Sequence, residues 1–68
     1  MIGCEYYIII CHFDKKTHCH IATNGKPDKY LPAMEFNRSV DAFSFIRENN
    51  LEIDCKCTVK KDRKEISQ

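Results

Sequence analysis

The pattern that most constrains this chain is an amphipathic helical period over residues 39–51, SVDAFSFIRENNL. Four apolar residues share one side of the predicted helix at about 100° per residue: Val40, Ala42, Phe43 and Ile46. Ser39 is suited to cap the first turn, and Asn49 or Asn50 is suited to end the helix in the left-handed conformation. A helix with one apolar side needs a partner surface, which the remaining residues have to supply.

Residues 5–13, EYYIIICHF, are rich in β-branched and aromatic side chains and are apolar at both odd and even positions. This composition predicts an interior strand with neither face fully exposed to solvent. The polar residues 14–17 predict a turn, and residues 17–23 predict a second, antiparallel strand. A loop with an even number of residues would place Cys11 opposite His20.

That predicted register divides the two strands into two faces. The face expected beneath the helix carries Tyr6, Ile8, Ile10, Cys19 and Ile21. The opposite face carries Tyr7, Ile9, Cys11, Phe13, His18, His20 and Ala22. Because one helix covers only one side of a sheet, this second face is expected to be left open, although it is too apolar for open solvent.

The rest of the chain completes an α+β pattern. Residues 52–60 alternate between polar and apolar side chains, which predicts a half-buried strand with these residues inward: Ile53, Cys55, Cys57 and Val59. Residues 26–38 contain Pro27 and Pro32 and predict a long loop, with at most a short edge strand over 33–36. The order β-β-(β)-α-β predicts a three- or four-stranded antiparallel sheet with one helix packed on one face.

The length and the cysteines limit the protein class. Sixty-eight residues suffice for one domain, predicted over residues 1–60, followed by a charged, flexible tail over residues 61–68. So small a core favours added stabilisation by a partner, a dimer or a metal. The five cysteines are odd in number and follow no recognisable secretory signal, so we expect reduced thiols and a cytoplasmic location. No apolar run approaches the roughly 20 residues of a membrane-spanning helix.

The segment 11–20, CHFDKKTHCH, suggests a zinc-stabilised domain as one alternative. In the predicted register Cys11, His18 and His20 share a face and could begin a zinc site. The spacing matches no paired Cys/His pattern, however, and side chains on a flat sheet converge poorly on a tetrahedral ion, so no cofactor is predicted. Cys11 facing His20 also resembles a nucleophile and its base, but no oxyanion donor accompanies them, so we predict that the protein is not an enzyme.

A nucleic-acid-binding module is a second alternative. Five basic residues near the C-terminus support it: Lys56, Lys60, Lys61, Arg63 and Lys64. Aromatic side chains on the sheet would then stack on bases. Asp54, Asp62 and Glu65 interrupt the basic run, and a net charge of +1 gives no strong attractive field.

The main prediction is a small non-enzymatic protein-binding domain. It would act as a regulator or inhibitor that docks on a larger protein, or it would form a homodimer, through the second sheet face. The residues expected to contact a partner are Tyr7, Ile9, Phe13, His18, His20, Tyr30 and Phe45. Phe45 lies at the edge of the apolar side of the helix, so it is either a core residue or an aromatic anchor for the partner.

Overall fold

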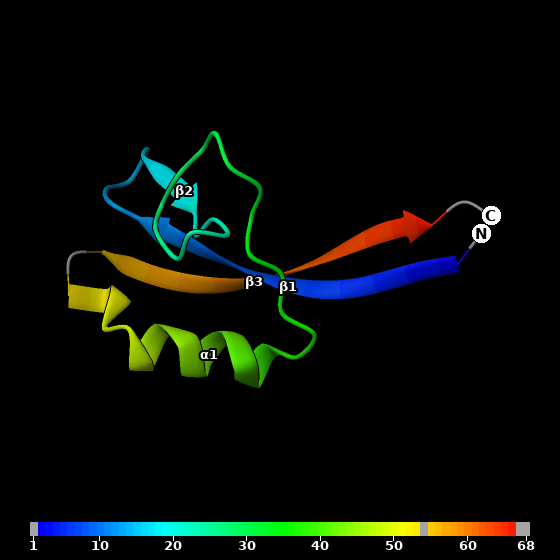
Figure 1. Cartoon of the computed structure of the whole chain (residues 1–68). Coiled ribbons are helices and arrows are strands. Elements are labelled where there is room, and N and C mark those ends of the chain that lie inside the picture. The colour runs from blue at the N-terminus through cyan, green and yellow to red at the C-terminus, as the bar shows by residue number, and fades with distance from the viewer. Residues whose placement is uncertain (1, 54, 67–68) are drawn as a thin grey trace.

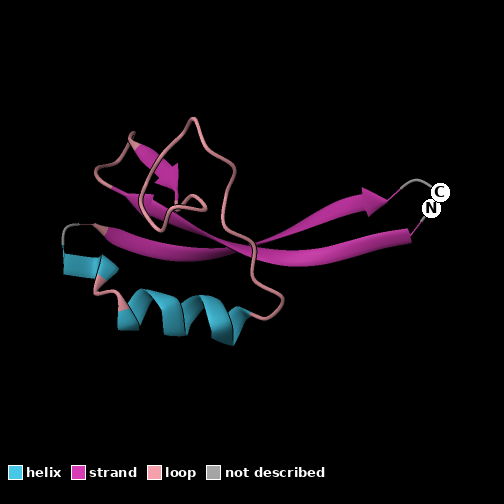
Figure 2. Cartoon of the chain, in the orientation of Figure 1, coloured by secondary structure: helices cyan, strands magenta, loops and turns pink. Residues whose placement is uncertain are grey.

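The computed structural model of the chain describes residues 2–53 and 55–66. Its elements follow the order β1 (Ile2–His12), β2 (His18–His20), α1 (Ser39–Glu48), a short 3-10 helix η1 (Leu51–Ile53) and β3 (Lys56–Ile66). The strands form one antiparallel sheet in the order β2-β1-β3, with α1 along one side (Figure 2). This arrangement confirms the predicted α+β fold in its three-stranded form. Among the described residues, no helix has the length and apolar composition to cross a membrane.

The long loop between β2 and α1 contributes single bridges to the sheet in place of the possible fourth strand. Tyr7 exchanges two backbone hydrogen bonds with Phe36, at 2.8 and 2.9 Å, and an isolated bridge joins Ala22 to Ala33. Within this loop Gly25 adopts a positive φ of 80°, a conformation that glycine adopts without a steric penalty. The loop is therefore held to the edge of β1 without forming a strand of its own.

The pairing of β1 with β2 differs by one residue from the predicted register. Cys11 faces Cys19 and Ile10 faces His20, whereas the sequence predicted Cys11 opposite His20. Because side chains alternate between the two faces of a strand, this shift moves every β2 side chain to the other face. Cys19 therefore lies on the same face as Cys11, and His20 lies on the opposite face.

The turn between the strands explains the difference. The backbone N–H groups of Lys16 and Thr17 donate to Oδ1 of Asp14, at 2.8 and 2.7 Å. The N–H of Phe13 also donates to the carbonyl of Thr17 at 2.9 Å. These contacts close a loop with an odd number of residues, for which Asp is well suited.

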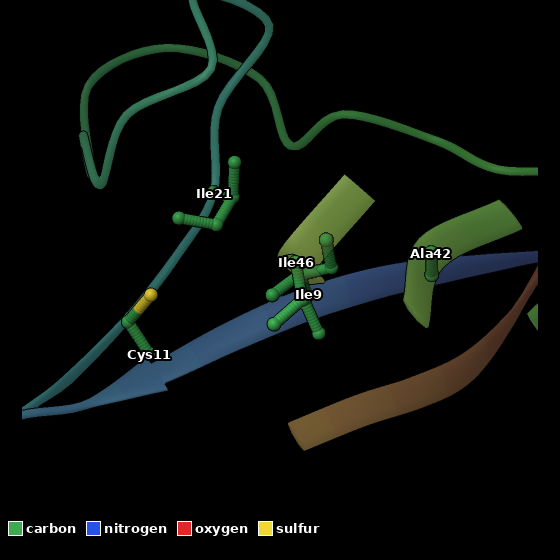
Figure 3. Packing of buried hydrophobic residues seen from close by; sticks show 5 residues of the cluster. All are labelled: Ile9, Cys11, Ile21, Ala42 and Ile46. Carbon is green, nitrogen blue, oxygen red and sulfur yellow. The ribbon is translucent and has the colours of Figure 1, made fainter. Parts of the chain in front are cut away.

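The corrected register determines which face of the sheet becomes the core. The buried cluster consists of Ile9, Cys11, Ile21, Ala42 and Ile46 (Figure 3). The prediction that α1 covers the face of Ile8 and Ile10 is therefore wrong, and so is the prediction that Ile9 lies on an open surface. The physical reason is that only this face is apolar across all three strands, because Val59 and Cys57 of β3 continue it.

The opposite face is mixed in character. Its register positions carry Ile8, Ile10, His12, His18, His20, Lys56, Thr58 and Lys60. Two contacts tether the loop to it: Nε2 of His20 donates to the carbonyl of Leu31 at 2.8 Å, and Nζ of Lys64 pairs with Glu35 at 2.8 Å. In Figure 1 this loop lies above the strands and α1 lies below them.

α1 turns a different side to the sheet than the sequence predicted. Ala42 and Ile46 are buried as predicted, and Phe45 packs against the core with its ring 5.6 Å from that of Phe36. By contrast, Val40 and Phe43 are 55% and 52% exposed. The helix has apolar residues on two sides, and the sheet covers the side that carries Phe45.

The ends of α1 agree only in part with the sequence. Arg38, rather than Ser39, is the N-terminal cap residue, and no side chain caps the helix. The Arg38 guanidinium instead pairs with Asp41 of the first turn at 3.1 Å. At the C-terminal end, Asn50 has a positive φ of 52°, which confirms the predicted stop in the left-handed region.

β3 begins and ends later than the predicted strand. Ile53, predicted to face inward, lies in η1 and is 77% exposed. Residues 61–66 of the segment predicted as a flexible tail belong instead to β3 and pair with the first half of β1, and Nζ of Lys61 lies 2.7 Å from Glu5. Residues 67–68 of the predicted tail lie outside the described residues. These two strands form an arm that extends from the rest of the domain (Figure 1), and at its end Ile2 pairs with Ile66.

The buried face can be tested with two adjacent isoleucines. We expect Ile9→Ala to lower the free energy of unfolding by about 2–5 kcal/mol, because it leaves a cavity beneath α1. Ile10→Ala is the matched control on the other, partly exposed face, with an expected loss of about 1 kcal/mol. Urea unfolding followed by circular dichroism measures both values. A larger loss for Ile10→Ala would contradict the observed choice of face.

Candidate functional site

Three cysteine thiols meet at one end of the core. Cys11 of β1 and Cys57 of β3 are direct partners in the register, and their Sγ atoms are 3.5 Å apart. Cys55 lies two residues before Cys57, and these two Sγ atoms are 3.9 Å apart. All three Sγ atoms lie within 4.8 Å of one another. We call this group the thiol cluster.

Two thiols of the cluster, those of Cys11 and Cys57, hold their protons tightly. Burial, reinforced by the neighbouring thiols of Cys55 and Cys57, raises the pKa of Cys11 far above its usual value. Burial is also the largest cause of the raised pKa of Cys57. A buried thiolate without a neighbouring cation is costly, so these thiols are neutral and weakly nucleophilic near neutral pH.

A pocket of about 230 Å³ opens beside the thiol cluster. It is lined by Cys11, Phe13, Pro27, Asn49, Asn50, Leu51 and Cys55. Sγ of Cys55 also donates to the carbonyl of Leu51 at 3.4 Å, which holds this thiol at the pocket wall. Two residues of the thiol cluster, Cys11 and Cys55, therefore line this pocket, and Cys57 does not.

The structure does not bring together the metal ligands that the sequence suggested. Cys11 lies on the helix side of the sheet, whereas His18 and His20 lie on the opposite side. His18 instead faces His12, with 5.9 Å between the ring centroids. Cys11 and His20 do not face each other either, so the suggested nucleophile and base are not a pair.

The thiol cluster was not predicted from the sequence, although one signal for it was present. Cys55 and Cys57 are two residues apart in a segment predicted as a strand, so their side chains were expected on one face. Nothing local to Cys11 indicates that it pairs with Cys57, because this contact depends on the β1–β3 register across a long stretch of chain. The sulfur contacts therefore follow from tertiary structure.

A second feature is a groove between α1 and η1 with a mixed apolar and polar lining. It has a volume of about 440 Å³ and is lined by Phe43, Ile46, Arg47, Asn50, Glu52 and Ile53. Phe43 and Ile53 expose half or more of their surface beside it, and Val40 lies one helical turn from Phe43. We call this surface the α1–η1 groove. It was not predicted, because Phe43 was assigned to the core and Ile53 to an inward strand position.

The residues predicted to contact a partner do not form one surface. Ile9 is fully buried, Tyr7 is half-buried, and Phe45 packs against the core. His18 and His20 lie on the other side of the sheet. The two remaining residues, Phe13 and Tyr30, are 49% and 86% exposed.

The basic residues of the nucleic-acid alternative are also divided. Lys56, Lys60 and Lys64 alternate on the sheet face opposite α1, and Lys61 and Arg63 point to the other face. Lys61 and Lys64 are engaged in ion pairs with carboxylates of Glu5 and Glu35.

Comparison of the chain with protein-family models, with curated proteins and with solved structures gave no match.

The raised thiol pKa values predict a loss of stability at alkaline pH in the reduced, metal-free protein. In the unfolded chain the thiols ionise near pH 9.0, whereas folded Cys11 and Cys57 retain their protons. Stability from this source is therefore complete below that pH and is lost as the pH rises above it. Urea midpoints measured from about pH 7 to about pH 10 test this expectation.

The control for this pH series removes the thiols themselves. The double variant Cys11→Ala/Cys57→Ala should lose less stability over the same pH range than the wild type, although it starts from a lower value. Cys19→Ala, which leaves the thiol cluster intact, should retain the wild-type slope. Equal slopes in all three proteins would show that the cluster thiols do not cause the loss.

Proposed function

We propose that this protein is a small non-enzymatic protein-binding domain whose binding surface is the α1–η1 groove. The observation that carries the proposal is the exposure of Phe43 and Ile53, which both line this groove. Single exposed apolar residues are common, but apolar residues gathered around a groove and bordered by charges are typical of interaction sites. Here Arg47 and Glu52 provide those charges.

The occupant that we propose is a second copy of the chain. An isologous interface requires a surface that is complementary to itself, with a protrusion and a hollow side by side. The exposed side chain of Ile53 and the hollow beside Phe43 meet this requirement. The charges meet it as well, because a two-fold axis can bring Arg47 of one protomer to Glu52 of the partner subunit.

Dimerisation would also offset the small size of the core. Only seven hydrophobic side chains among the described residues are buried: Ile8, Ile9, Cys11, Ile21, Ala22, Ala42 and Ile46. A single core of this size stabilises a domain by no more than about 3–5 kcal/mol. Covering Phe43 and Ile53 in an interface would add buried apolar area, and association stabilises the folded state by mass action.

Substitution of Phe43 tests the proposal. We expect the wild-type protein to form dimers in sedimentation velocity experiments, and Phe43→Asp to raise the dimer Kd by about 30-fold or more, as for a hot spot of about 2 kcal/mol. Tyr30→Asp is the matched control, because Tyr30 is an exposed aromatic residue outside the groove. Circular dichroism verifies that both variants keep the fold.

A charge exchange tests the symmetry of the interface. Arg47→Glu alone should weaken the dimer through repulsion of Glu52 of the partner subunit, and Arg47→Glu combined with Glu52→Arg should restore it. A protein that is monomeric at every concentration would exclude the homodimer. In that case a different protein would have to occupy the groove. An effect of Tyr30→Asp as large as that of Phe43→Asp would argue against the groove itself.

A further inference from the structure

We propose that Cys11, Cys55 and Cys57 form a zinc-binding site; none of these three cysteines lines the α1–η1 groove. Zinc binds thiolates at about 2.3 Å in tetrahedral geometry, which requires sulfur atoms about 3.8 Å from one another. The two closest Sγ separations in the cluster, 3.5 and 3.9 Å, lie on either side of this value. The third pair is within 4.8 Å, so a small side-chain rotation completes the triangle.

The fold pre-organises these ligands. The β1–β3 register sets Cys11 directly opposite Cys57. Cys55 precedes β3, and its Sγ lies 3.9 Å from that of Cys57. The carbonyl of Leu51 holds Cys55 near the other two sulfurs, because it accepts a hydrogen bond from the Cys55 thiol at 3.4 Å. Because the ligands already converge, little chain ordering is left for the binding step.

Charge favours zinc over a monovalent thiophilic ion. On binding, the three thiols release three protons to solvent, and three thiolates with Zn²⁺ carry a net charge of −1. The same thiolates with Cu⁺ would carry −2. Cys11 is completely buried, and a larger uncompensated charge costs more in such surroundings.

The fourth position of the ion has room for a ligand from solvent. The pocket of about 230 Å³ is lined by Cys11 and Cys55. Three protein ligands and one water are the coordination typical of catalytic zinc sites, whereas structural sites usually have four protein ligands. Here the open position follows from the three cysteines of the cluster. The ion would link β1, β3 and the segment after η1, and would thereby stabilise the domain.

Zinc titration of the reduced protein tests this site. In the presence of a phosphine reductant, we expect one Zn²⁺ per chain by native mass spectrometry and a melting temperature that rises with zinc and falls with chelator. Co²⁺ used as a substitute should show intense sulfur-to-cobalt charge-transfer bands. Cys55→Ser and Cys57→Ser should each lower zinc affinity by more than about 100-fold. Substitution of a residue that only contacts a zinc ligand typically lowers metal affinity by about 10- to 100-fold.

Cys19→Ser is the matched control. Cys19 is half-buried and lies opposite Cys11 on β2, but its Sγ donates to the carbonyl of His20 and is outside the cluster. This variant should bind zinc as the wild type does. Phe43→Asp should also bind zinc as the wild type does, which would show that zinc binding does not depend on the groove. The substitutions are made at Cys55 and Cys57 because these residues are only half-buried. The core residue Cys11 is left in place, so the fold is retained.

Three results would overturn the zinc site. The first is the absence of zinc binding by the reduced, folded wild-type protein. The second is unchanged zinc affinity in both Cys55→Ser and Cys57→Ser. The third is a Co²⁺ spectrum without sulfur bands, together with loss of binding in His12→Gln/His18→Gln, which would place the ion on the opposite face of the sheet.

Discussion

The hydrogen bonds that the Asp14 carboxylate accepts in the first turn determine where the core of this domain lies. They close the loop between β1 and β2 with an odd number of residues and so set the register of the hairpin. Because the side-chain period of a strand is two, a one-residue change exchanges the faces of β2. With Cys19 and Ile21 on the same face as Ile9, that face becomes the apolar one, and α1 packs there.

The same alternation of side chains places the clustered cysteines and the histidines on opposite faces of the sheet. Cysteine side chains from β1 and β3 gather beside the core, where burial keeps them protonated. The histidines gather on the opposite face, where His20 holds the long loop through Leu31. Soft sulfur ligands and imidazoles that alternate in the sequence thus lie on different sides of the sheet, and only the sulfur atoms converge closely enough for a shared ion.

α1 connects this core to the surface that we propose for binding. A narrow sheet covers one side of the helix, the side of Ala42, Phe45 and Ile46, and leaves Phe43 beside the groove. An apolar side chain that the core has no room for becomes available for another protein. The proposed interface and the proposed zinc site would therefore both compensate for a core too small to bury all the apolar groups of the chain.

Local sequence was sufficient to specify the individual elements: an amphipathic helix stopped by the left-handed Asn50, an apolar first strand, the turn at Asp14 and their order in an α+β fold. Contacts between distant segments, by contrast, set the hairpin register, the side of α1 that is buried, the extension of β3 to Ile66 and the meeting of Cys11 with Cys57. The individual elements depend on hydrogen bonds and apolar spacing within a few residues, which can be read along the chain. When a strand is apolar on both faces, its sequence does not indicate which face is buried. Only the packing of the whole domain selects one of them.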